Sequence, residues 1–471
     1  MSDYDLIVVG SGMGGHAAAI AAAEEGGRVL VLEAAERFGG TSAMSGGSIY
    51  AAGTSVQRAA GVEDSPDALF EHYMALNNWL LDPSIVRRYC DEAPAAIDWL
   101  IGMGVRFAPE KLYRAGVERG ARGHSTEGFG PQLMETVHGY ASARGVEFIA
   151  NTRVERLLVE DGAVCGVHAQ GTDLRATAVV IACGGLGSNV ELRQAYYPDA
   201  ARWNEWHHYI GGSHVRGDSI SLGLAAGAVV ARSTINRGVL LRAPNFGGRD
   251  IEGYMPNWLF FVNREGRRFA DETVPYAVMD GIINAQTDQS CWAIMDDAMF
   301  HRADGKSREN PFVPGTFAPN WDHQVLAEQL AKGKVIKGET LQALCEKVGI
   351  NHPALANNIA RYNNYVESGR DEQFFKDMNG AWVLGEGPYY AVEVKAVIVC
   401  NTAVGLEVDR EAQVQDTADA PIPGLYAVGE AAGGVVGKYL GGGNTLGAGA
   451  IFGRIAGRNA MQRARTQAAA S

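Results

Sequence analysis

The chain has 471 residues, and its 41 Lys and Arg against 54 Asp and Glu give a formal net charge of −13. This acidic balance argues against nucleic acid as the main partner, because phosphate binding needs a basic surface. A hydrophobic fraction of 46% excludes general disorder. At about 150 residues per domain, the length suggests two or three domains. Glycine is the unusual component, because 60 residues without a matching rise in proline predict many tight turns and close backbone approaches.

The sequence also bears on compartment and metals. No window approaches about 20 unbroken apolar residues, so we expect no membrane span. The acidic start, residues 1–5, runs directly into an apolar stretch and does not resemble a signal peptide, so we expect a cytoplasmic protein. No pair of cysteines forms C-x-x-C, which predicts reduced thiols and no metal or iron–sulfur site. The six cysteines are Cys90, Cys165, Cys183, Cys291, Cys345 and Cys400.

The first 33 residues predict a strand–turn–helix–strand unit. Residues 4–9 form an apolar run of strand length, and residues 10–15 form a glycine-rich turn. Residues 16–25 are rich in alanine and predict a helix, which Gly26 and Gly27 close. Residues 28–32 predict the next strand. This order is typical of a βαβ unit.

The remaining elements alternate in the same style, apart from one central region. The pattern predicts a helix over 83–106, a hairpin over 153–168 around Asp161-Gly162, strands over 178–182 and 424–428, an amphipathic helix from Asn351, and a final helix over 447–460. Residues 236–390 carry more aromatic residues and fewer alanines. We therefore expect an α/β fold in which residues 1–235 and 391–471 form one domain and residues 236–390 form a second domain inserted into it.

The glycine turn predicts a dinucleotide site. In Gly10-x-Gly12-x-x-Gly15, the first glycine allows a tight turn, the second lets backbone approach a pyrophosphate, and the third allows close helix–strand packing. The helix that follows directs the positive end of its dipole to that place. Glu33 stands 18 residues after Gly15, at the end of the second strand, where a carboxylate can accept hydrogen bonds from ribose hydroxyls. A structural glycine turn is the alternative interpretation.

Two further segments favour FAD over NAD. Residues 37–47, Arg-Phe-Gly-Gly-Thr-Ser-Ala-Met-Ser-Gly-Gly, and residues 424–431, Gly-Leu-Tyr-Ala-Val-Gly-Glu-Ala, resemble FAD-contacting segments of one large flavoprotein family. That family includes the fumarate reductase and succinate dehydrogenase flavoproteins and the 3-ketosteroid dehydrogenases. The resemblance covers nearly the whole chain. It implies a Rossmann-like FAD-binding domain formed by residues 1–235 and 391–471, with an inserted α+β capping domain over 236–390. It implies FAD contacts at Gly10, Gly12, Gly14, Gly15, Glu33, Ala34, Gly40, Thr41, Ser42, Gly46, Gly47, Val154, Ala182, Gly184, Asp218, Gly429, Glu430, Asn444 and Leu446.

The same resemblance points to catalytic residues. Residues 261–272 match a recurrent family segment, after which fumarate reductases carry a proton-delivering arginine. Here Tyr276 follows Pro275 at that place, as does the general-base tyrosine of the 3-ketosteroid dehydrogenases. In the last loop, Tyr439 and Gly443 match the hydroxyl and the N–H that bind the ketone oxygen in those enzymes. The arginine and histidine that grip a dicarboxylate in fumarate reductases have no counterpart here.

These residue types suit one reaction. Desaturation next to a ketone removes an α proton and a β hydride, and donors on the carbonyl oxygen stabilise the developing enolate. We therefore expect an FAD-dependent desaturase of a steroid or smaller ring ketone. The alternatives are a reductase of an activated double bond (similar to fumarate or urocanate reductases), an electron-transfer subunit and a non-catalytic flavin-binding protein. The sequence leaves the electron acceptor and the oligomeric state open.

Overall fold

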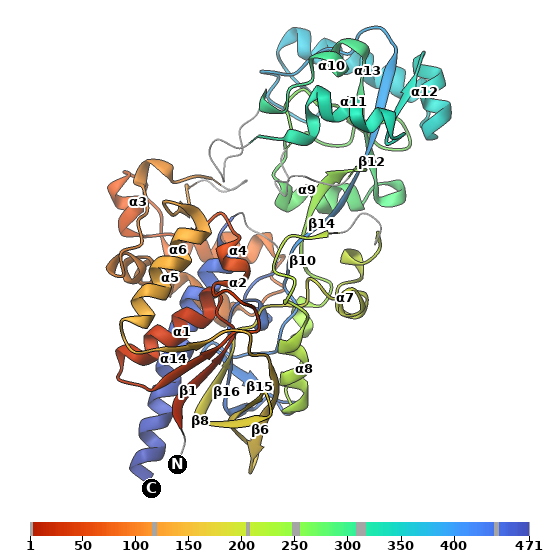
Figure 1. The fold of residues 1–471 in the computed structure, drawn as a ribbon. Coiled ribbons are helices and arrows are strands. Elements are labelled where there is room, and N and C mark those ends of the chain that lie inside the picture. The colour runs from red at the N-terminus through yellow and green to blue at the C-terminus, as the bar shows by residue number, and fades with distance from the viewer. Residues whose placement is uncertain are drawn as a thin grey trace. The chain divides into compact units, whose positions relative to one another are not determined.

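The computed structural model describes residues 3–114, 120–203, 208–246, 255–307, 317–437 and 442–470 (Figure 1). The chain forms two compact units. The first unit contains Met1–Arg202, Gly211–Val239 and Asn401–Ser471, and the second contains Trp203–Ile210 and Leu240–Cys400. No helix among the described residues combines the length and the apolar character that a membrane crossing needs.

A largely parallel sheet forms the centre of the first unit. Its strands follow the order β15-β16-β8-β1-β2-β5, in which β16, β8, β1, β2 and β5 run parallel. A hairpin of β6 and β7 continues antiparallel from β8. The strands are β1 (Tyr4–Val9), β2 (Val29–Leu32), β5 (Glu147–Ile149), β6 (Val154–Glu160), β7 (Ala163–Ala169), β8 (Thr172–Ile181), β15 (Gln413–Gln415) and β16 (Pro421–Ala427).

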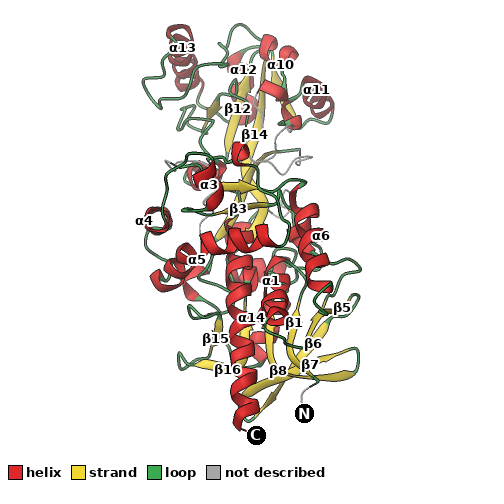
Figure 2. Ribbon diagram, turned by 90° about the vertical axis from the view of Figure 1, so that its left-hand side faces the viewer, coloured by secondary structure: helices red, strands yellow, loops and turns green. Residues whose placement is uncertain are grey.

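Helices α1 (Met13–Glu24) and α14 (Asn444–Ala470) pack together against this sheet. Figure 2 shows α14 running beside α1, and both are rich in residues with little or no side chain. A separate two-stranded sheet joins β3 (Ser48–Tyr50) to β4 (Gly123–Ser125). The helices of this unit are α1 (Met13–Glu24), α2 (Gly40–Ala43), α3 (Ser55–Ala59), α4 (Pro66–Leu76), α5 (Pro83–Gly102), α6 (Phe129–Ser142), α7 (Val190–Tyr196), α8 (Asp218–Ala225) and α14 (Asn444–Ala470).

Several elements match the expectations and others differ at their ends. The first strand and the Asp161-Gly162 hairpin are confirmed; both turn residues have positive φ, 50° and 76°. Helix α1 begins at Met13, three residues earlier than expected, because His16 N donates to Gly12 O (3.0 Å) and draws the glycine turn into the helix. Strand β8 begins at Thr172, before the expected 178, and ends at Ile181 in place of 182, whereas helix α14 extends beyond both ends of the expected range 447–460.

The second unit contains a mixed sheet covered by helices. Its order is β10-β14-β12-β11, with β13 and β9 also paired to β14. Its hydrophobic core includes Trp258, Trp321 and Tyr362, all almost fully buried. The elements are β9 (His208–Tyr209), β10 (Gly238–Pro244), β11 (Phe261–Val262), α9 (Tyr276–Asn284), β12 (Cys291–Met295), α10 (Asp297–Arg302), α11 (His323–Ala331), β13 (Val335–Gly338), α12 (Leu341–Val348), α13 (His352–Ser368) and β14 (Tyr389–Thr402).

The boundaries of this unit differ from the expected 236 and 390. The expected end falls inside β14, a strand of 14 residues, and the compact unit runs on to Cys400. β14 cannot be divided at 390, because β13 pairs continuously with its residues from Tyr389 to Val392. Residues 203–210 also belong to this unit, since β9 pairs with β14.

Candidate functional site

The glycine turn between β1 and α1 combines closely packed positions with an open one. A Cβ on Gly15 would lie 2.0 Å from Gly10 O, and one on Gly10, whose φ is +103°, would lie 2.6 Å from Ala182 O. A Cβ on Gly14 would likewise lie 2.9 Å from Val428 Cγ2. By contrast, a Cβ on Gly12 would meet nothing closer than Ser42 Oγ at 3.5 Å. Packing therefore requires three of these glycines, and Gly12 leaves room for a ligand.

Glu33 ties this turn to the next loop. Its Oε2 accepts from Ser11 N (2.9 Å) and Ser11 Oγ (2.6 Å), and its Oε1 accepts from Ala35 N (2.9 Å). Ser11 Oγ also accepts from Gly39 N (3.0 Å). A carboxylate offers about four acceptor positions. At least three of these positions accept hydrogen bonds from the protein itself, so Glu33 has a structural role that the sequence did not indicate. Its contact with ribose stays a prediction, as does that of Ala34, which follows it.

The short helix α2, which follows Gly39, lies against the glycine turn. Ser42 Oγ accepts from Met13 N (3.0 Å), and Thr41 Oγ1 accepts from Gly212 N (3.0 Å). A Cβ on Gly40 would have Gly12 Cα as its nearest neighbour, at 4.0 Å. Gly46 and Gly47 lie between α2 and β3, where a Cβ on Gly47 would clash with Thr126 Oγ1 at 2.3 Å. The structure therefore brings Gly40, Thr41 and Ser42 together with Gly12.

The chain returns to this region after β16. Gly429 has a φ of +65°, and a Cβ there would meet nothing within 4 Å. The next residue, Glu430, accepts from Thr402 N through Oε1 (2.7 Å). Its surroundings strip water from the carboxyl group, and this desolvation raises the pKa of Glu430 to about 7.

We expect Glu430→Gln to change how stability depends on pH in the protein stripped of FAD. The folded pKa of about 7 lies above the reference value of 4.5, so the folded state keeps a proton that the unfolded state loses between those values. Wild-type stability should fall across this window by about 3 kcal/mol from this group, and the variant should not show that fall. Thermal unfolding of both proteins from pH 4.5 to 8 measures it. A difference between the two proteins that is independent of pH would contradict the assignment.

Helix α14 begins beside helix α1. A Cβ on Gly449 would lie 3.0 Å from Gly14 N, and one on Gly453 would lie 2.4 Å from Gly14 O. The first residues of α14 include Asn444, which is fully buried, and Leu446. Two helix N-termini and the open positions at Gly12, Gly40 and Gly429 therefore occur in one unit. Such an arrangement fits a long dinucleotide that needs backbone donors and close approach from more than one loop.

Four other predicted contacts lie around the sheet. Val154 opens β6, and Ala182 N donates to Val9 O (2.8 Å). Gly184 has a φ of +81° and packs against Val215. Asp218 opens α8 and forms an ion pair with Arg153. The N-cap position of α8 is occupied by Gly217, so helix capping does not explain Asp218.

The predicted catalytic residues are placed in part. Tyr276 opens α9 in the second unit, and Pro275 O accepts from Val278 N (3.0 Å) and Met279 N (3.2 Å). Gly443, in the first unit, has a φ of +119°, and a Cβ there would lie 2.8 Å from the backbone of Ile49. Its carbonyl accepts from Tyr50 N (3.1 Å) and Gly447 N (2.9 Å). Tyr439 lies outside the described residues.

Comparison with known proteins places these features among flavoproteins. A family model described as "FAD binding domain" matches residues 5–446. A fumarate reductase (cytochrome) from Shewanella frigidimarina is 30% identical over 465 residues, covering 97% of this chain and 77% of that protein. A urocanate reductase from Eggerthella lenta is 31% identical over 477 residues, covering 98% and 75%.

Ring-ketone dehydrogenases are also similar to the chain. A 4-oxocyclohex-2-ene-1-carboxylate 5-dehydrogenase from Sinomonas cyclohexanicum is 27% identical over 567 residues, covering 97% of this chain and 93% of that protein. Among solved structures, a 3-ketosteroid-delta4-(5alpha)-dehydrogenase from Rhodococcus jostii has a TM-score of 0.76 at 26% identity, covering 98% of each chain. The open conformation of a flavocytochrome c3 fumarate reductase has a TM-score of 0.70 at 28% identity, covering 98% of this chain and 78% of that one.

Proposed function

This chain belongs to the FAD-binding domain family that contains the fumarate reductase flavoproteins, and on that premise we propose that it desaturates a ring ketone beside its carbonyl group. It is an FAD-dependent oxidoreductase. The observation that supports the proposal is the tyrosine that directly follows Pro275 and opens α9. The sequence pattern places it where fumarate reductases carry an arginine.

The proposal gives each catalytic residue one task. The Tyr276 phenol takes the proton from the carbon next to the carbonyl, and the Tyr439 hydroxyl and the Gly443 N–H bind the carbonyl oxygen. Two such donors stabilise the negative charge that develops on this oxygen, and each is typically worth a few kcal/mol. Bound FAD supplies the acceptor for the hydride that leaves the β carbon. A carbon–carbon double bond remains in the ring.

Two of the similar proteins support a ring ketone as the substrate class. The Sinomonas dehydrogenase is named for a six-membered ring that carries an oxo group, and the Rhodococcus structure is that of a ketosteroid dehydrogenase. We propose a substrate with a ketone in a six-membered ring, either single or part of a fused system.

Product analysis tests this proposal. The purified protein is incubated with 3-oxosteroids, cyclohexanone or 4-oxocyclohexane carboxylic acid, together with an artificial electron acceptor. We expect one ketone to yield an enone lighter by two hydrogens, one from the α and one from the β carbon. Absence of an enone from every ring ketone would contradict the proposal.

Reduction of an activated double bond is the second candidate. The names of the Shewanella and Eggerthella relatives support it, because both are reductases at 30% and 31% identity. Against it stands the lack of the cations that grip a dicarboxylate in the fumarate reductase pattern. Rapid reoxidation of chemically reduced protein by fumarate or urocanate would favour this candidate over the ketone.

A further inference from the structure

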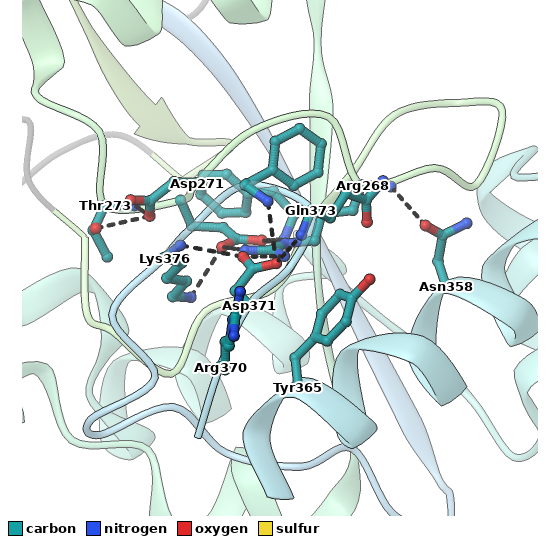
Figure 3. Close-up of polar contacts among 12 residues, drawn as sticks. Arg268, Asp271, Thr273, Asn358, Tyr365, Arg370, Asp371, Gln373 and Lys376 are labelled. Atoms are coloured by element: carbon teal, nitrogen blue, oxygen red, sulfur yellow. Dashed lines mark hydrogen bonds and ion pairs between the residues drawn. The ribbon is translucent and has the colours of Figure 1, made fainter. Parts of the chain in front are cut away.

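Two basic and two acidic side chains lie buried together in the second unit. Arg268 and Glu272 come from the segment after β11. Asp371 and Lys376 come from the loop after α13, and Figure 3 shows them beside Arg268. Their side chains are no more than 1% exposed. We call these residues the buried quartet. It joins two segments that are about a hundred positions apart in the sequence.

The contacts within the quartet balance the charges. Arg268 donates through Nε and Nη2 to the two oxygens of Glu272 (2.8 and 3.0 Å) and through Nη1 to Asp371 Oδ2 (2.6 Å). Lys376 Nζ donates to Glu272 Oε2 and to Leu259 O, both at 2.9 Å. Burial alone would raise the pKa of Glu272, but Lys376 and Arg268 outweigh it and hold that pKa below its usual value. The quartet is therefore two cations and two carboxylates.

The loop that supplies two members of the quartet is itself folded around one of them. Asp371 Oδ1 accepts from Gln373 N (2.9 Å) and Phe374 N (3.1 Å). The Arg268 guanidinium lies 5.1 Å from the ring centroid of Phe374 and 5.2 Å from that of Tyr362. Glu272 Oε1 also accepts from Phe261 N in β11 (3.2 Å). The position of Glu272 is therefore fixed from several directions.

Hydrogen bonds fix the three residues that link Glu272 to Tyr276 along the chain. Thr273 N and Oγ1 both donate to Asp271 Oδ1 (2.7 Å), and Val274 N donates to Asp271 O (3.2 Å). Arg242, in β10, donates through Nη1 to Val274 O (3.0 Å). Pro275 then accepts the first hydrogen bonds of α9. Each residue between Glu272 and Tyr276 therefore takes part in at least one hydrogen bond.

Stability alone does not call for buried charges, since apolar residues of similar volume often serve as well. We propose that the buried quartet positions the segment that carries Tyr276, so that its members are positioning residues for the proton-removal step. This inference rests on the proposed function. It predicts that a change in the quartet slows the step through Tyr276 and leaves substrate binding nearly unchanged.

The test compares Lys376→Met with a matched control. Asp296→Asn also alters a buried carboxylate of this unit, but Asp296 accepts from Met299 N, as the cap of α10, and from Gly385 N. With the ketone that the protein oxidises, we expect Lys376→Met to slow flavin reduction by about 10–100-fold, with KM changed less than about threefold. Asp296→Asn should keep the wild-type rate. If Lys376→Met does not fold, Arg268→Lys, which loses the paired hydrogen bonds to Glu272, takes its place.

The same substitution, made in Tyr276→Phe protein, distinguishes a positioning role of Lys376 from a merely structural one. In Tyr276→Phe protein, Lys376→Met should slow flavin reduction no further, because the residue it acts through is already lost. Equal rates for Lys376→Met and Asp296→Asn would overturn the inference, as would full additivity with Tyr276→Phe. If Tyr276→Phe alone keeps the wild-type rate, the proposed base fails; if only Lys376→Met does, the inference fails and the proposed function stands.

Discussion

Tyr276→Phe should slow reduction of the bound flavin by a ring ketone about 10²–10⁴-fold, the usual contribution of a general base. The substitution removes one oxygen at the start of α9 and leaves the ring and the backbone in place. FAD should stay bound in full, because the predicted FAD contacts lie in the first unit and Tyr276 lies in the second.

Stopped-flow absorbance of the flavin, without oxygen, measures this effect. Tyr389→Phe is the matched control, because it also removes one tyrosine hydroxyl from the second unit. The Tyr389 hydroxyl donates to Gly385 O (2.9 Å). The control should react as the wild type does. A Tyr276→Phe protein that keeps its flavin and reacts at the control rate would refute the proposed base.

Gly453→Ala should destabilise the first unit by about 3 kcal/mol, the upper end for added volume in a packed interface. The new Cβ would lie 2.4 Å from Gly14 O and 2.7 Å from the Cβ of Ala17. A backbone atom cannot move aside as a flexible side chain can. Because Gly14 belongs to the glycine turn, we also expect weaker FAD binding.

Thermal unfolding together with flavin release measures the change. Gly139→Ala is the matched control, since Gly139 lies in α6 and a Cβ there would meet nothing within 4 Å. It should stabilise the protein by up to about 1 kcal/mol through helix propensity. Destabilisation of the same size by both substitutions would argue against close packing of α1 on α14.

Local patterns predicted the local structure well. The glycine turn, the Asp161-Gly162 hairpin and the helix from Asn351 each carry their own signal, because turn chemistry and helix capping act over a few residues. Asn351 caps α13 through Ala354 N (3.0 Å), as expected for its position before His352 and Pro353. The family resemblance added what these short signals lack, namely the cofactor.

Features that depend on distant partners were not predicted. Gly449, Gly453 and Gly457 repeat at four-residue spacing and face α1, a signal that was present in the sequence but has meaning only beside an alanine-rich partner. Arg268 and Glu272 look like surface charges in a run of polar residues, yet both are buried. They also pair with Asp371 and Lys376, about a hundred positions away, and the local sequence does not indicate these partners. The length of β14 was likewise set by pairing with several strands.

The most direct test of ketone desaturation is an anaerobic titration of the purified yellow protein. The panel contains 3-oxosteroids, cyclohexanone and 4-oxocyclohexane carboxylic acid, with succinate as the control. We expect one ring ketone to bleach the flavin with no added acceptor, and succinate to leave it oxidised. Bleaching by succinate alone, or silence from every ketone followed by reoxidation of reduced flavin with an unsaturated acid, would contradict the account.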